Sequence, residues 1–238
     1  LGDVYKRQVV EEIDGVKLLN VDPGKATNRT VITFVGEPEP VIEAAYQLIK
    51  KASEVIDMSK QTGEHPRFGA TDVCPFIPVT GVSDQECINL SHEVGKRVGD
   101  ELGIPVYFYE KSAKQSDRIR LPDIRKGEYE GLADKLANKN WRPDNGPSKV
   151  HIRGGATVIG CRDFLIAYNI YLNTQDHRLA TDIAFELREA GRSKRIPNPQ
   201  SKNLLDGEIV RNKDGTPVKT KGIFKDIKAI GWYVDTFK

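Results

Sequence analysis

Residues 16–56 read VKLLNVDPGKATNRTVITFVGEPEPVIEAAYQLIKKASEVI, and this stretch decides the fold. An apolar segment over residues 16–21 stops at the turn signal 22–24, and the β-branched run 30–35 suits a second strand. Apolar residues then recur at steps of three and four over residues 41–56, which is the period of an amphipathic helix. Two paired strands followed by a helix favour an open-faced α/β sandwich over a doubly wound sheet.

Further helices and strands are predicted on the C-terminal side of this stretch. Residues 83–86 form an S-x-x-E capping box that opens a second helix, and Gly103 ends it. Residues 73–79 and 104–109 are predicted as strands, and the first contains two prolines, which is typical of an edge or bulged strand. The long apolar run 164–172 predicts a buried strand.

A domain boundary is predicted near Phe164. The chain has 238 residues, enough for one large domain or two small ones that each bury a core. Beyond the boundary, residues 192–222 are rich in Lys, Asn, Pro, Gly and Asp, which predicts an exposed insertion. The expected fold class is α+β.

Composition excludes several classes of function. Lys and Arg total 36 against 34 Asp and Glu, so the chain lacks a global electrostatic footprint for nucleic acid. No apolar run approaches the roughly 20 residues that span a bilayer, which argues against a membrane role. Cys74, Cys87 and Cys161 lack the spacing of a metal site and are expected to be reduced thiols. Residues 1–8 do not read as a secretory signal, so a cytoplasmic protein with a small-molecule partner is expected.

The densest cluster of polar and reactive side chains is residues 63–72, GEHPRFGATD. This segment is a predicted loop between a helix and a strand, where rigid scaffolds often display reactive groups. His65 lies next to Glu64 and two residues before Arg67, and its imidazole titrates near neutrality, which suits a general base that then acts as an acid. The alternative is that His65 only hydrogen-bonds the backbone of a loop rich in Gly and Pro.

Two other segments carry side chains or backbone suited to a ligand. Asp22, Asn28 and Arg29 place a carboxylate, an amide and a guanidinium in the connection between two strands, and an arginine fork suits a substrate carboxylate. The alternative is a local turn with a solvated arginine. The glycines of residues 146–148 and 154–155 would let the backbone approach a flat ligand closely.

Several of these segments together resemble the formiminotransferase family, in a form similar to the bacterial enzymes. The most specific are G-E-H-P-R at 63–67 and D-V-C-P-F-I-P at 72–78, and the likeness extends from about Val10 to Trp232. The remaining matching segments are 22–24, 27–31, 34–36, 146–148 and 164–169. The resemblance implies two ferredoxin-like α/β subdomains, each an antiparallel sheet backed by helices, with folate in a groove between them. These subdomains correspond to residues 9–163 and 164–238.

The resemblance also implies glutamate formimidoyltransferase activity. A formimino group would move from formiminoglutamate to N5 of tetrahydrofolate, as part of histidine breakdown, with tetrahydrofolate as co-substrate and no metal. His65 would be the general base. Arg29 and Arg67 would hold the donor carboxylates, and Asp22, Glu64 or Asp72 would face the amidine cation. Asn28 and the folate-contacting stretch complete the expected substrate-binding set; that stretch is Gly146, Pro147, Ser148, Lys149, Val150, His151, Ile152, Arg153, Gly154 and Gly155.

The chain departs from the family pattern at both ends. Residues 1–8 do not match the family's first strand, and the second subdomain stops before its last elements, so a truncated and inactive or unstable fragment is expected. Two other functions are considered: formyl transfer from formylglutamate, and folate binding without catalysis. The sequence leaves open a fused cyclodeaminase domain, the polyglutamate preference and a homo-oligomer.

Overall fold

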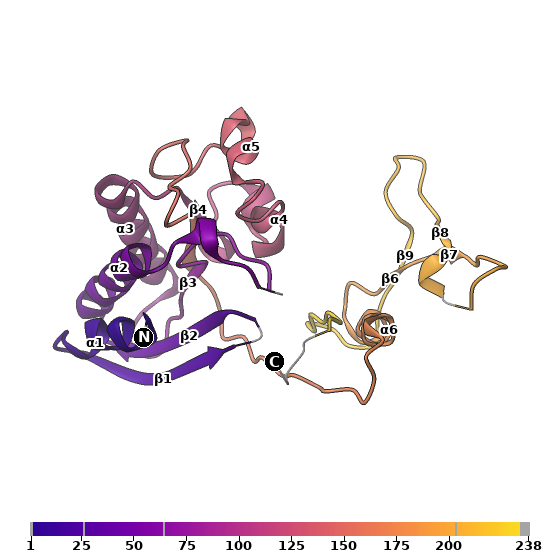
Figure 1. Ribbon diagram of the computed structural model, residues 1–238, viewed down its shortest axis with the longest axis horizontal. Helices are drawn as coiled ribbons and strands as arrows, with labels where there is room; N and C mark the ends of the chain where they lie inside the picture. The colour runs from indigo at the N-terminus through magenta and orange to yellow at the C-terminus, as the bar shows by residue number, and fades with distance from the viewer. Residues whose placement is uncertain (1, 26, 64, 203, 234–238) are drawn as a thin grey trace. The chain divides into compact units, whose positions relative to one another are not determined.

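The computed structural model describes residues 2–25, 27–63, 65–202 and 204–233, in two compact units that divide between residues 166 and 167 (Figure 1). The sequence places this boundary between residues 163 and 164. Helices and small sheets occur in the first unit, and the fold is α+β in this coarse sense. Within the described residues, no helix combines the length and apolar character needed to cross a membrane.

The first unit opens with helix α1 (Gly2–Glu11) and a β-hairpin. Strands β1 (Val16–Gly24) and β2 (Arg29–Gly36) pair antiparallel along their whole length, which confirms the predicted pair of strands. Residues 22–24 continue β1, although the sequence marks them as a turn. Pro23 is tolerated there because β1 pairs with β2 on one side only among the described residues, so a missing N–H costs no ladder bond on the other side.

Helices α2 (Pro38–Val55) and α3 (Asp84–Leu102) follow the predicted amphipathic patterns. The apolar face of α2 is buried, and α3 begins with both hydrogen bonds of the predicted capping box. Gly103 ends α3 in the left-handed region at φ 63°, a conformation that costs glycine little because it has no Cβ. Both predicted helices are thus confirmed.

The central sheet has the order β3 (Val73–Phe76), β5 (Thr157–Cys161), β4 (Val106–Phe108), and its strands are parallel. The antiparallel sheet implied by the family resemblance is therefore wrong here. Helix α3 forms the crossover from β3 to β4, the two strands that flank β5, and a helical crossover makes the strands that it joins parallel. Strand β3 ends at Phe76, before the second of the two prolines in the predicted strand 73–79.

Both faces of this sheet are covered, so the open-faced sandwich is also a wrong prediction. Successive residues of β5 alternate: Ile159 packs into the core shared with α2 and α3, whereas Val158 packs into a second core. The second core includes Ile124 of α4 (Leu121–Arg125) and Leu132 of α5 (Leu132–Ala137). Among its described residues, the unit also contains the short 3-10 turns η1 (Met58–Lys60), η2 (Glu110–Ser112), η3 (Ser116–Arg118) and η4 (Lys139–Trp141).

A buried ion pair lies beneath this second layer of helices. Arg118 and Asp144 have side chains 1% and 3% exposed, and Nη1 of the arginine lies 3.1 Å from Oδ1 of the aspartate. Asp144 Oδ2 also accepts a hydrogen bond of 2.9 Å from the Phe108 backbone N–H. The guanidinium lies over the rings of Tyr107 and Trp141.

Replacing Asp144 by alanine is expected to destabilise the protein by about 3–5 kcal/mol, because Arg118 would remain buried without its counter-charge. Urea unfolding followed by circular dichroism measures the change. Asp100→Ala is the control, since Asp100 pairs with Lys96 at an exposed position and should contribute under about 1 kcal/mol. Equal losses in the two variants would contradict the role assigned to the buried pair.

The second unit contains helix α6 (His177–Leu187) and two short antiparallel ladders. Strands β6 (Arg192–Ser193) and β9 (Lys219–Thr220) pair, as do β7 (Arg195–Ile196) and β8 (Glu208–Ile209), with the 3-10 turn η5 (Leu204–Asp206) between the latter two. Both ladders lie within the predicted insertion 192–222.

Residues 164–172 form no strand, which corrects the prediction of a buried one. Ile166 and Tyr168 are 92% and 84% exposed. A strand requires a neighbour that accepts and donates its backbone hydrogen bonds, and no described segment pairs with this one. Apolar content alone was an insufficient signal.

Candidate active site

His65 lies in the loop between η1 and β3. The loop is anchored just after the histidine by Phe68, whose side chain is fully buried in the second core. The Phe68 backbone N–H donates to Asp72 Oδ1 at 3.0 Å, which closes a tight turn. The half-buried imidazole of His65 therefore lies three residues before the anchored side chain of Phe68.

The described contacts of the His65 ring include one acceptor and one donor. Nδ1 lies 2.8 Å from the Pro66 carbonyl oxygen, which only accepts, and Nε2 lies 2.8 Å from Arg29 Nη1, which only donates. The arginine Nη1 also lies 2.7 Å from Nδ1. With its proton on Nδ1, a neutral ring can donate to the Pro66 carbonyl and keep a lone pair on Nε2. Arg29 Nη1, which lies near both ring nitrogens, can then donate only to Nε2.

The surroundings of His65 favour this neutral form. Burial lowers the pKa of the imidazole, and the nearby charges of Arg29 and Arg125 lower it further. The Pro66 carbonyl and the Asp72 carboxylate act in the opposite direction but do not reverse the change. The ring is thus an acceptor at neutral pH, which is the state that a general base requires.

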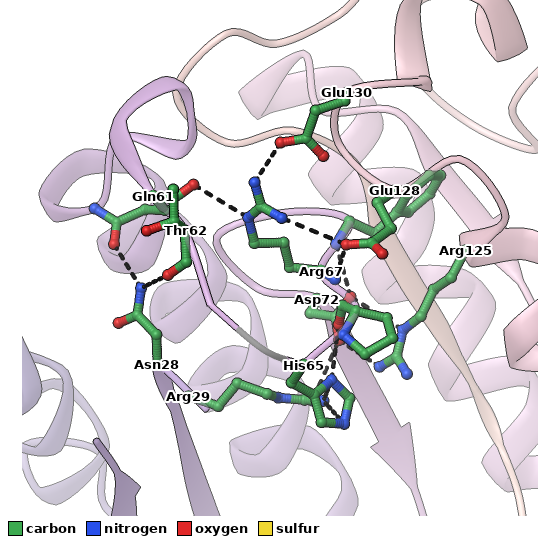
Figure 2. A network of polar contacts seen from close by, with 12 residues as sticks. Asn28, Arg29, Gln61, Thr62, His65, Arg67, Asp72, Arg125, Glu128 and Glu130 are labelled. Atoms are coloured by element: carbon green, nitrogen blue, oxygen red, sulfur yellow. Dashed lines mark hydrogen bonds and ion pairs between the residues drawn. The ribbon is translucent and has the colours of Figure 1, made fainter. Parts of the chain in front are cut away.

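Asp72 connects Arg29 to a second arginine (Figure 2). Arg125, at the end of α4, donates from Nε to Asp72 Oδ1 at 3.1 Å and from Nη2 to Oδ2. Arg29 Nη2 lies 3.2 Å from the same Oδ2. The Asp72 and Arg125 side chains are 11% and 12% exposed, so water screens this group of charges only weakly.

Asn28 positions the strand that carries Arg29. It occupies the left-handed region at φ 50°, and its amide donates to Gln61 Oε1 at 3.0 Å and to the Thr62 carbonyl at 2.7 Å. Asparagine tolerates this backbone conformation better than most residues. The start of β2 is thereby attached to the loop that leads to His65.

Arg67 belongs to a separate cluster. Its guanidinium pairs with Glu128 at 3.4 Å and with Glu130, and its Nε donates to the Gln61 carbonyl at 3.2 Å. In Figure 2 its side chain points toward these two glutamates and away from His65. Arg67 also lines a cavity of about 490 Å³ together with Met58, Ser59, Lys60, Gln61, Thr62, Tyr129, Glu130, Ala133 and Val150.

The segment 146–155 meets the histidine loop at its C-terminal end. The Ala70 N–H donates to the Gly154 carbonyl at 2.9 Å, and the Ala156 N–H donates to the Phe68 carbonyl at 3.1 Å. A Cβ placed on Gly69 would lie 2.1 Å from the Ala156 carbonyl oxygen, so the close approach requires glycine.

Other residues of this segment serve local structure. His151 Nδ1 accepts from the Gly154 N–H at 2.8 Å, and Arg153 Nη2 donates to the Glu54 carbonyl at 2.6 Å. Tyr129 donates to the Ile152 carbonyl at 2.7 Å. Residues 146–149 follow a sharp turn and are mostly exposed, and no described contact brings them to His65.

Comparison with known proteins identifies the family. Residues 6–162 match the model of the formiminotransferase domain, N-terminal subdomain, and residues 167–238 match that of the formiminotransferase domain. The chain belongs to the formiminotransferase family. The first match begins inside the segment 1–8 that the sequence prediction set apart.

Curated members of the formiminotransferase family align closely with the chain. It is 44% identical over 233 residues to the formimidoyltransferase-cyclodeaminase of Dictyostelium discoideum, covering 97% of this chain and 38% of that protein. It is 45% identical over 181 residues to the glutamate formimidoyltransferase of Streptococcus pyogenes serotype M1. That alignment covers 76% of this chain and 60% of the bacterial protein. The alignments therefore cover 38% and 60% of the length of these two relatives, which is less than two thirds in each case.

Within this formiminotransferase chain, the structure brings some predicted site residues together and leaves others apart. Arg29 contacts both His65 and Asp72, and Asn28 attaches the start of its strand to the loop that leads to His65. Asp22 is exposed on β1, and no described contact joins it to this group. Glu64 lies outside the described residues.

The sequence prediction missed the acidic and basic residues that surround this group. Arg125, Glu128 and Glu130 lie in a stretch without apolar period, and Gln61 lies just before the recognised cluster. In the sequence, the local signal is a run of charged residues on both sides of Gly127. In the structure, Gly127 has a positive φ of 91°, which is typical of a tight turn. That signal indicates a turn but no contact with Asp72.

Proposed function

We propose that this chain transfers the formimino group of formiminoglutamate to N5 of tetrahydrofolate, with His65 as the residue that moves the proton. The observation that carries the proposal is a half-buried imidazole that lies against Arg29, where burial lowers its pKa and favours the neutral form. The loop that presents it is hydrogen-bonded to the segment 154–156. The names of the glutamate formimidoyltransferases of Streptococcus pyogenes serotype M1 and Thermoplasma acidophilum support the same reaction.

The reaction requires one proton to move between two nitrogens. N5 of tetrahydrofolate attacks the amidine carbon and forms the new C–N bond, and it must lose its proton. The bond from that carbon to the glutamate nitrogen then breaks, and the departing nitrogen must gain a proton. His65 Nε2 accepts the first proton and donates it to the second nitrogen, which requires no other acid or base.

Arg29 is proposed to hold a carboxylate of the donor. Its Nη1 donates to His65 and its Nη2 makes a 3.2 Å ion pair with Asp72. A charged carboxylate is a stronger acceptor than a neutral imidazole, so it would take Nη1 from His65. Donor binding would thereby release the Nε2 lone pair at the moment the base is needed.

The cavity beside Arg67 is proposed to receive part of the folate. Its volume of about 490 Å³ lies in the range of ligand pockets, and Val150 of the predicted folate-contacting stretch lines it. The same proposal treats residues 9–163 and 164–238 as two subdomains of one cytoplasmic enzyme that acts on small molecules without a metal.

Turnover with two donors tests the proposal. The chain is incubated with tetrahydrofolate and either formiminoglutamate or formylglutamate, and the folate product and free glutamate are measured by mass spectrometry. Formiminoglutamate is expected to give 5-formiminotetrahydrofolate and equimolar glutamate. Faster turnover of the formyl donor would assign formyl transfer instead. Calorimetric binding of tetrahydrofolate without product from either donor would indicate a non-catalytic folate-binding domain.

A further inference from the structure

We propose that Arg125 is a positioning residue, which occupies Asp72 so that Arg29 stays directed at His65 and available to a substrate carboxylate. This inference rests on the function proposed above. It is carried by the geometry around Asp72, where two guanidinium groups share one carboxylate in a weakly screened setting.

The acceptor sites of Asp72 are filled unequally by the two arginines. A carboxylate has about four lone-pair sites. Asp72 Oδ1 accepts hydrogen bonds from the Phe68 N–H at 3.0 Å and from Arg125 Nε at 3.1 Å. Asp72 Oδ2 accepts a hydrogen bond from Arg125 Nη2, and Arg29 Nη2 lies 3.2 Å from the same oxygen. Arg125 thus forms the two-bond fork and Arg29 makes a single, longer contact.

Without Arg125, the fork on Asp72 would be open to Arg29. Arginine and carboxylate groups prefer two parallel bonds, so Arg29 would turn both terminal donors toward Asp72. Its Nη1 would then leave His65 and would no longer face the donor site. Arg125 prevents this rearrangement by competition, without touching the imidazole in any described contact.

Arg125 also affects the charge around the base. The described charged groups that act on His65 are Arg29 from β2, Arg125 from α4 and Asp72 from the loop before β3, so positive charge prevails. Removing Arg125 removes one positive charge, and the rearranged Arg29 would be neutralised by Asp72. Both changes favour the imidazolium form, and the pKa of His65 should rise.

The experiment combines histidine titration with kinetics on the full chain. Two-dimensional NMR follows the imidazole ring of His65, assigned with His65→Gln, in the wild type and in Arg125→Gln. The variant is expected to titrate at higher pH and to show about a tenfold higher KM for formiminoglutamate, with the KM for tetrahydrofolate unchanged. Arg120→Gln is the matched control, because Arg120 is exposed next to the same helix and pairs only weakly with Asp123 at 3.7 Å.

Arg125→Lys separates the charge from the fork. Lysine keeps the positive charge but offers no planar pair of donors, so this variant should still raise the donor KM, while its His65 titration should move less than in Arg125→Gln. Unchanged titration and unchanged donor KM in Arg125→Gln would overturn the inference, even if its melting temperature falls. Should Arg125→Gln fail to fold, a wild-type donor KM in Arg125→Lys overturns it equally. A wild-type chain that transfers no formimino group, but whose His65 titration moves in Arg125→Gln, refutes the proposed function and leaves the role of Arg125 in place.

Discussion

The His65→Ala variant is expected to lose about two to four powers of ten in kcat for formimino transfer, the usual contribution of a positioned acid or base. Its KM values should change little, because the ring acts on the proton in transit and Arg29 holds the donor. Steady-state kinetics with formiminoglutamate and tetrahydrofolate measures both parameters. Residual turnover should remain, because holding the two substrates in the reactive geometry accelerates the reaction even without the imidazole.

His177→Ala is the control for this experiment. His177 is exposed in the first turn of α6, and it lies in the other unit. It should retain wild-type kcat. A His65→Ala variant with wild-type kcat, or with lost folate affinity as its only defect, would reject His65 as the general base.

The expected pH dependence of kcat/KM follows from the lone pair on His65 Nε2. Because burial and two arginines lower the pKa of His65, the neutral base should persist below the ordinary range near pH 6.5. The value of kcat/KM should therefore fall only when the pH drops below that range, as Nε2 takes up a proton in the free enzyme. An acid limb at or above the ordinary histidine range, measured with the wild type, would contradict the assignment.

The helices were predictable because their signals are local. Ser83 and Glu86 are three residues apart, and the cap they form depends on little else. The central sheet was not predictable in the same way. Val73 pairs with Val158, although the two residues are far apart in the sequence. No local sequence pattern specifies whether such a pairing is parallel. The family resemblance supplied an antiparallel arrangement, and the crossover through α3 overrides it for this sheet.

The candidate site shows the same division between local and distant information. The residues 63–72 marked a reactive loop, and two of them, His65 and Asp72, both contact Arg29. Arg67 lies two residues from His65 in sequence, but the loop turns its side chain to the opposite side, toward Glu128. Arg125 is 53 residues from Asp72, and only the fold brings it there.

The second large effect on activity is expected from the replacement of Arg29. Arg29→Ala is expected to reduce kcat/KM for formiminoglutamate by about 100-fold, because the charge-assisted hydrogen bond from Nη1 to the donor carboxylate would be lost. Most of the loss should appear as a raised donor KM, with the KM for tetrahydrofolate unchanged. Arg29→Lys should recover only part of it, since an ammonium cannot form the planar fork.

Arg7→Ala serves as the control for charge alone, since Arg7 is exposed on α1 and pairs only with Glu11 among its described contacts. It should keep wild-type kinetics. If Arg29→Ala instead raises the KM for tetrahydrofolate and spares the donor, the guanidinium holds the folate carboxylates, and the release of His65 must be assigned to folate binding. If neither KM changes, Arg29 serves only to keep the imidazole neutral, and its variant should then show an acid limb of kcat/KM displaced to higher pH, because a positive charge next to Nε2 has been removed.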